Sequence, residues 1–289
     1  MKKHITTILL ILVVLIGLSL VLYPSISNWW NETRSSKVIS DYSELVAELD
    51  EDEYEQMWAD AVAYNADRAG ALNPYLLTPE HKQRYQSVLN LGGNGVMGYI
   101  EIPSIGVSLP IYHTVNEDIL QVAAGHVEWS DLPVGGAGTH SVLSGHRGLP
   151  SAKLFTDLDD LREGDVFVLR ILDATLTYEV DQILIVEPED VKNLRRVQGQ
   201  DLCTLVTCTP YGVNTHRLLV RGHRIENTPE AAVIRVTANA VPLDSTIVAL
   251  IAAIPMMIVS MTGLLLISKH RSRRRYRRNL IRNRTTPSA

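Results

Sequence analysis

Cysteine is scarce in this sequence, with only two among 289 residues, Cys203 and Cys208. They stand five positions apart in an apolar run that is predicted to be extended, so their side chains point to opposite faces of one strand. A bridge between them is therefore not expected, and the chain has no disulfide framework. No pair of Cys or His at ligand spacing is accompanied by carboxylates, so we predict neither a metal site nor a cofactor.

Charge is missing from two long stretches, residues 5–23 and residues 245–268. Each is long enough to cross a hydrocarbon core of about 30 Å at about 1.5 Å per helical residue. We therefore predict a transmembrane helix near each end of the chain, in contact with membrane lipid. A cleaved signal peptide is the alternative for the first stretch, but that stretch is long and no small-x-small site follows it before Asn28.

Basic residues flank both apolar stretches. Lys2 and Lys3 precede the first, and nine lysines and arginines lie in residues 269–289. Positively charged flanks stay in the cytoplasm, so we expect both termini inside the cell and the middle of the chain outside. We interpret the basic tail as a topology signal and an anchor to anionic lipid, with nucleic-acid binding as the remote alternative.

The part between the two stretches is acidic, because it holds nearly all of the 32 acidic residues but only 16 of the 27 basic ones. This charge argues against nucleic acid as a partner. An external protein that keeps an unpaired thiol without a disulfide framework invites a chemical explanation. We interpret Cys203 as a small buried hydrophobe, which leaves Cys208 as the candidate reactive thiol.

Residues 24–90 are predicted to form a helical arm. An acidic segment at 40–71 carries a narrow apolar stripe at helical spacing. Asn73-Pro74-Tyr75 interrupts it, because the residue before a proline leaves the helical region. A short helix at 79–89 follows, with Thr78 as its cap.

The apolar pattern changes to a period of two after a glycine-rich segment that begins at residue 91. It predicts seven or eight short strands up to residue 225, separated by turns and by helices at 115–124 and 151–161. For such a mainly β segment, a closed or nearly closed β-barrel is the economical architecture. The predicted organisation is a cytoplasmic start at 1–4, a transmembrane helix at 5–23, the arm at 24–90, the barrel at 91–225, a linker at 226–244, a second transmembrane helix at 245–268 and a cytoplasmic tail at 269–289.

Three reactive side chains stand at predicted strand ends. Cys208 ends one strand, Arg217 lies on the next strand, and His146 follows a third strand in the run Ser144-Gly-His-Arg-Gly148. A thiol, an imidazole and a guanidinium are the groups needed for acyl transfer through a thioester. His216 is the rival imidazole, but it directly precedes Arg217 and should face the opposite side of that strand. A papain-like protease is disfavoured, because there the cysteine precedes the histidine.

Residues of about 40–268 resemble the sortases, the membrane-bound cysteine transpeptidases of Gram-positive bacteria. Thr204-Leu-Val-Thr-Cys208 matches the Thr-Leu-x-Thr-Cys motif of that family, and Gly98-Tyr-Ile-Glu-Ile-Pro103 matches the beginning of its eight-stranded barrel. More closely, the chain is similar to the class C, pilus-assembling sortases, which also have a C-terminal membrane span. That similarity rests on Ser144-Gly-His-Arg-Gly-Leu-Pro150, Leu154-Phe-Thr-Asp-Leu158, Cys208-Thr-Pro-Tyr211 and His216-Arg-Leu-Leu-Val-Arg-Gly-His-Arg224.

The resemblance implies roles for the three residues: Cys208 as the nucleophile, His146 as the acid and base, and Arg217 beside the reacting carbonyl. It implies a donor with a Leu-Pro-x-Thr-Gly-like sorting signal, cut after Thr, and the lysine of a pilin subunit as the acceptor. A wall-anchoring sortase that uses a peptidoglycan precursor is the alternative enzyme. A membrane-tethered binding domain without catalysis is the alternative from another class.

The resemblance also implies a lid at Asn73-Pro74-Tyr75. Class C sortases carry an Asp-Pro-aromatic lid whose aspartate pairs with the catalytic arginine and whose aromatic ring covers the thiol. Asn73 has no charge, so we expect a weaker lid, held by Tyr75 packing and by a neutral hydrogen bond to Arg217. An ordinary turn is the alternative.

Overall fold

We describe a computed structural model of the chain, which gives the structure of residues 2–70, 73 and 75–227. All of these residues belong to one compact unit, Met1–Val241. Pro74, most of the linker at 226–244, the second predicted span at 245–268 and the basic tail lie outside the described residues.

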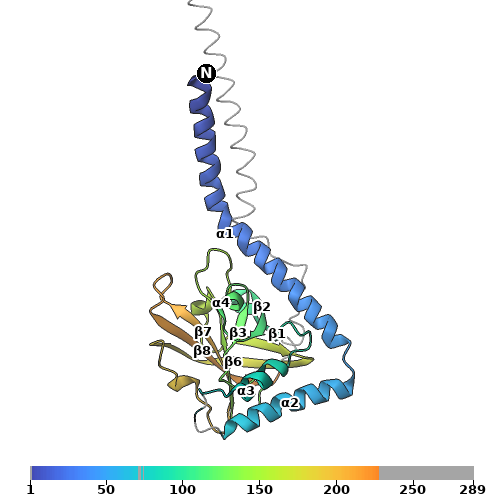
Figure 1. Cartoon of the computed structure of the whole chain (residues 1–289). Coiled ribbons are helices and arrows are strands. Elements are labelled where there is room, and N and C mark those ends of the chain that lie inside the picture. The colour runs from blue at the N-terminus through green and yellow to red at the C-terminus, as the bar shows by residue number, and fades with distance from the viewer. Residues whose placement is uncertain (1, 71–72, 74, 228–289) are drawn as a thin grey trace, which may run out of the picture. The chain divides into compact units, whose positions relative to one another are not determined.

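Three helices precede the barrel: α1 (Lys2–Ala47), α2 (Glu51–Ala69) and α3 (Pro79–Ser87). The prediction of one helix over 40–71 is wrong, because α1 continues from the apolar stretch to Ala47 and a separate helix begins after Asp50. Asp50 Oδ1 accepts from the Glu53 backbone N at 2.8 Å, and this capping box starts α2. Pro24 lies inside α1, and Figure 1 shows a bend in this helix, as a proline produces by removing a helical hydrogen bond.

The remaining described residues form a closed eight-stranded barrel, which confirms the predicted fold of this part (Figure 1). The strand order is β1-β2-β3-β4-β7-β8-β6-β5, and the pairs β2–β3 and β4–β7 are parallel. The strands are β1 (Val96–Ile102), β2 (Val107–His113), β3 (Ala124–His126), β4 (Thr139–Ser144), β5 (Val166–Ile171), β6 (Ala174–Val186), β7 (Asp201–Thr209) and β8 (His216–Ile225).

Two helices that the sequence predicts in the barrel differ from the structure. The first is only α4 (Glu117–Leu120), because β3 begins at Ala124. The predicted helix at 151–161 is wrong: a 3-10 turn, η2 (Leu158–Asp160), is the only helical part of it. Leu154 has a positive φ of 43°, which ends any helix there, and the Phe155 backbone N donates to His146 O at 3.1 Å, closing a loop. Two further 3-10 turns are η1 (Pro103–Ile105) and η3 (Lys192–Leu194).

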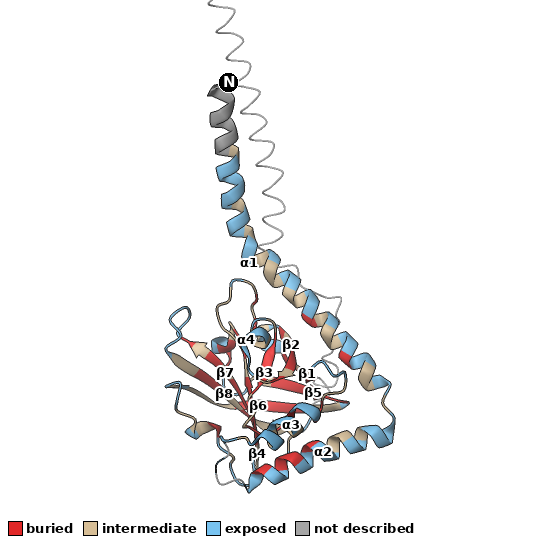
Figure 2. Cartoon of the chain, viewed as in Figure 1, coloured by how far each residue is buried: buried red, intermediate tan, exposed pale blue. Residues whose placement is uncertain are grey.

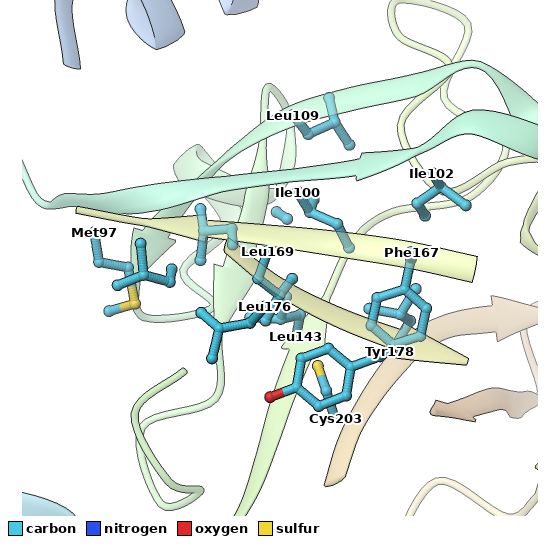
Figure 3. Packing of buried hydrophobic residues seen from close by; sticks show 14 of the residues in the cluster. Met97, Ile100, Ile102, Leu109, Leu143, Phe167, Leu169, Leu176, Tyr178 and Cys203 are labelled. Atoms are coloured by element: carbon cyan, nitrogen blue, oxygen red, sulfur yellow. The ribbon is translucent and has the colours of Figure 1, made fainter. Parts of the chain in front are cut away.

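The barrel interior is the hydrophobic core (Figure 2, red). Figure 3 shows Cys203 of β7 among its side chains, beside Tyr178 and Phe167, whose rings stack with centroids 5.5 Å apart. Gly222 of β8 is required here, because a Cβ at this position would lie 2.7 Å from the Phe167 ring. Burial of each such large apolar side chain stabilises the fold by roughly 1.5–3 kcal/mol. The side chains on one face of β7 are therefore part of the core, and those on the opposite face are available for catalysis.

Candidate active site

Cys208 lies at the end of β7 on the face that points away from the core. Cys203 and Leu205 are fully buried inside the barrel, and the alternation of a strand places Cys208 on the opposite face, as predicted. Cys208 is only partly buried. Burial raises the pKa of the Cys203 thiol well above its ordinary value. Cys208 is therefore the thiol that solvent and a substrate can reach.

Arg217 is the direct cross-strand partner of Cys208 in the antiparallel pair β7–β8. Directly paired residues project to the same face, with Cβ atoms about 4.5–5.5 Å apart. Arg217 Nη1 donates to Asn214 O at 3.3 Å and to His216 O at 3.0 Å. These bonds use one of the three guanidinium nitrogens, so the group still has donors for an oxyanion.

His146 reaches the thiol through the parallel pair β4–β7. Ser144 is paired with Val206, and the ladder continues with a bond from Gly145 N to Val206 O at 3.0 Å. His146 comes two residues after Ser144, beyond the end of β4, and Cys208 comes two residues after Val206 on β7. Gly145 is required before His146, because a Cβ there would lie 2.6 Å from the Phe155 ring. The fold thus pairs Cys208 with Arg217 directly and pairs the strand that leads to His146 with the strand of Cys208.

Glu117 is a residue of this site that the sequence did not reveal. Its Oε1 lies 3.4 Å from His146 Nε2, and its side chain is 70% exposed. Glu117 begins α4, directly before β3, and β3 pairs with β4 next to His146. In the sequence, Glu117 is only an acidic residue in a short helical turn. That feature is too common to indicate a role in the site.

The rival imidazole lies elsewhere. His216 is paired with Thr209, so it projects to the face of β8 opposite Arg217. Its Nε2 lies 3.2 Å from Glu187 Oε1. His216 therefore does not share the face of Arg217 and Cys208.

An apolar strip, here called the outer strip, extends from Cys208 along the outer face of the barrel. It begins at Val206, two residues before the thiol, and includes the buried Val142 and Leu219 of the neighbouring strands. Its remaining members come from β6, from the β3–β4 loop and from the β6–β7 loop. They are Val127, Trp129, Leu184, Val186, Val191 and Leu194.

The predicted lid lies at the far end of the outer strip. The Tyr75 ring packs edge-on against Trp129, with centroids 5.0 Å apart, and Arg195 Nε donates to the Tyr75 hydroxyl at 3.4 Å. Arg195 O accepts from His140 Nδ1 at 2.8 Å, and His140 is paired with Leu202. A cavity of about 470 Å³ lies between these residues and the barrel.

The contacts expected of the lid differ from those observed. Asn73 Oδ1 accepts from Tyr75 N at 3.1 Å, whereas Arg217 bonds to its own turn, so the expected Asn73–Arg217 hydrogen bond is not formed among the described residues. The asparagine instead closes a local turn on its own backbone, as this residue type favours. The contacts observed for Tyr75 are with Trp129 and Arg195.

Chemically, the site offers a partly exposed thiol directly paired with a fixed cation, and these groups suit acyl transfer through a thioester. Within residues 2–70, 73 and 75–227, no group of three or more His, Cys, Asp or Glu side chains is arranged to hold a metal ion. Of the described helices, α1 contains one segment, Ile11–Ala47, that is long and apolar enough to cross a membrane.

Comparison with known proteins identifies the family of the chain. Residues 100–225 match the family model described as Sortase domain. The chain is 49% identical to sortase C1 from Streptococcus agalactiae, with a TM-score of 0.65 over 66% of this chain and 100% of that one. It is 44% identical to Clostridium perfringens sortase C with the C-terminal cell wall sorting motif, with a TM-score of 0.59 over 66% and 98%. It is 27% identical to Sortase A of Bacillus anthracis over 76% of this chain and 95% of that protein.

Proposed function

Because the chain belongs to the sortase family of cysteine transpeptidases, we propose that it cleaves a Leu-Pro-x-Thr-Gly-like sorting signal after Thr and transfers the acyl group to a lysine amine of a pilin subunit. The acyl group is carried as a thioester on Cys208. The observation that supports this assignment is the strand register, which pairs Cys208 with Arg217 and pairs the strand that leads to His146 with the strand of Cys208. The pilin acceptor is favoured because the similar solved structures at 40–49% identity are mostly sortases C.

Each of the three residues has a defined role in the proposed mechanism. The Cys208 thiolate attacks the Thr carbonyl carbon, and Arg217 donates hydrogen bonds to the oxyanion that forms. His146, as imidazolium, gives its proton to the leaving glycine amine when the C–N bond breaks. The lysine amine then attacks the thioester, His146 takes a proton from it, and the thiolate leaves. The guanidinium cannot lose its proton, so Arg217 serves as a donor and not as a base.

Glu117 is proposed to position His146. A carboxylate oxygen 3.4 Å from Nε2 holds the imidazole ring in one orientation. Its exposure means that water and salt screen the attraction, so the contribution to rate is modest. Glu117 touches neither the thiol nor the carbonyl in this mechanism.

The sorting signal is proposed to lie over the outer strip, with the scissile bond at Cys208 and the leading residues toward Trp129. The strip offers apolar surface for the leucine and proline of the signal. Tyr75 occupies the far end of this path. In this arrangement the lid competes with the peptide for Trp129 and does not shield the thiol.

The apolar part of α1 is proposed to anchor the barrel on the outer side of the cell membrane. The charge-free residues 5–23 and the flanking Lys2 and Lys3 support this orientation. The second span at 245–268 and the cytoplasmic tail remain predictions from sequence, and with them the two-pass topology.

A wall-anchoring sortase is the second candidate, favoured by the similarity to Sortase A of Bacillus anthracis. The two candidates differ in their acceptor. Purified enzyme is given a sorting peptide, and the adduct on Cys208 is trapped and identified by mass spectrometry. The acyl-enzyme is then offered a lysine-bearing pilin or a peptidoglycan precursor amine. Transfer to the pilin lysine supports the proposal, transfer to the precursor alone supports the second candidate, and no adduct on Cys208 overturns both.

A further inference from the structure

One continuous helix contains both the predicted membrane segment and the residues that bind the barrel. On the barrel side of α1, Asn28 Oδ1 accepts from Lys153 N at 2.7 Å, and Asn31 Nδ2 donates to Ser151 O at 3.0 Å. Further along, the Tyr42 hydroxyl donates to Met97 O at 3.0 Å and accepts from Leu172 N at 2.8 Å. These contacts extend over 14 residues of helix, about 21 Å, and no loop separates them from the membrane segment.

Two adjacent tryptophans stand where α1 leaves the apolar stretch. Trp29 is 44% exposed and Trp30 is 65% exposed, and at about 100° per helical residue both project to other sides of the helix than Asn28. They lie six and seven residues beyond Tyr23, about 9–10 Å along the helix. The headgroup region adds roughly 5–7 Å on each side of the hydrocarbon core, and a tilted helix covers less depth per residue. Tryptophan is enriched at this boundary because its ring is apolar and its N–H needs a polar partner.

The barrel loop that meets α1 is also the loop that carries His146. Ser151 and Lys153 make the contacts to α1, and the loop closes where Phe155 N donates to His146 O at 3.1 Å. Only four residues separate His146 from Ser151. The height of this loop above the membrane therefore fixes the height of the catalytic imidazole.

We propose that the barrel surface at Ser151–Lys153 rests on the phospholipid headgroups, with Trp29 and Trp30 inserted among these headgroups. The continuous α1 then holds the active site at a set height above the bilayer. This inference rests on the membrane span at 5–23 that is part of the proposed function. The proposed binding partner of this surface is the phospholipid bilayer.

The first test uses the full chain reconstituted in phosphatidylcholine vesicles whose acyl chains carry bromine, a quencher of tryptophan fluorescence, close to the headgroups or deep in the core. Shallow bromine is expected to quench more strongly than deep bromine. The difference is lost in a Trp29→Phe/Trp30→Phe variant and kept in Trp58→Phe, the matched control, since Trp58 lies on α2 and stacks on Tyr54. Protein that floats with the vesicles without this difference overturns the inference alone. Protein that does not float overturns the membrane span as well.

The second test inserts seven helical residues between Tyr23 and Asn28, which raises the barrel by about 10 Å. Cleavage of a sorting peptide in solution is expected to stay at the wild-type rate. Cleavage of the same signal on a membrane-anchored substrate is expected to fall several-fold. An equal effect on both substrates, or on neither, overturns the role of height, and loss of peptide cleavage in the wild-type chain instead overturns the proposed function.

Discussion

The Tyr75 ring packs edge-on against the Trp129 ring, with 5.0 Å between their centroids. This contact holds Tyr75 of the predicted lid on Trp129, a member of the outer strip. We expect a lid on this strip to hinder a long peptide and to leave the thiol open to a small reagent.

Tyr75→Ala is expected to increase kcat/KM for a sorting peptide by about fivefold, because an aromatic pair contributes on the order of 1 kcal/mol. The rate at which a small thiol reagent modifies Cys208 is expected to change little. Tyr54→Ala, which removes another aromatic pair on α2, serves as the control and should leave both rates unchanged.

Asn73→Asp changes the other described residue of the predicted lid and tests whether the lid covers the thiol. Asn73 bonds to Tyr75 N and not to Arg217, so the new carboxylate should not slow modification of the thiol. Parallel changes in peptide cleavage and thiol modification in either variant would show that the lid covers Cys208 after all.

Cys208→Ala is expected to abolish acyl-enzyme formation, whereas Cys203→Ala should keep it. Cys203 lies in the core and its thiol has a raised pKa, so it is neither accessible nor ionised. Its replacement leaves a small cavity that lowers the free energy of unfolding by about 1 kcal/mol. Mass spectrometry after alkylation should find the label on Cys208 alone, and a thioester in the Cys208→Ala protein would contradict the proposed nucleophile.

Arg217→Lys is expected to lower kcat by about 10²-fold with little change in KM, because a lysine keeps the charge but loses the fork of donors that meets an oxyanion. Arg221→Lys is the matched control on the same strand. Arg221 binds Asp181 at 2.9 and 3.1 Å, and its replacement should leave kcat close to wild type. Equal losses in both variants would indicate a structural role for Arg217.

Glu117→Gln is expected to lower kcat by a few-fold without changing KM, because the His146 ring loses the carboxylate that orients it from 3.4 Å. Asp118→Asn removes the same charge one residue away on α4. If kcat falls equally in both variants, the effect comes from the general field of α4 and not from contact with His146.

The stability of the barrel is expected to fall as the pH is lowered from neutral. Burial lowers the pKa of His126 to about 3, and its Nδ1 accepts from the Tyr85 hydroxyl at 3.0 Å while Nε2 donates to Asp131 O at 2.7 Å. Between about pH 6.5 and pH 3, the unfolded chain therefore binds a proton that the folded chain does not. This difference lowers the free energy of unfolding by about 2 kcal/mol at about pH 5 relative to about pH 7.5.

Urea unfolding at the two pH values measures this change. A His126→Gln protein is expected to be less stable overall and to show a smaller pH dependence by about the same 2 kcal/mol. An unchanged pH dependence would mean that other groups cause it.

The sequence by itself determined the features that depend on neighbours along the chain. Alternation on β7 placed Cys203 and Cys208 on opposite faces, and the β7–β8 hairpin paired Cys208 with Arg217, because a short turn fixes an antiparallel register. The strand count predicted the barrel, and the motifs at Cys208 and His146 indicated the family.

Only the tertiary structure decided the contacts between distant segments. The parallel pairing of β4 with β7 aligns His146 with Cys208, and the pairing of β3 with β4 brings Glu117 to the imidazole. The packing of Tyr75 on Trp129 and the continuity of α1 were likewise not readable from local pattern. The physical reason is that a residue pattern fixes which face of a strand or helix is apolar, whereas the order of strands in a closed barrel depends on the packing of the whole core.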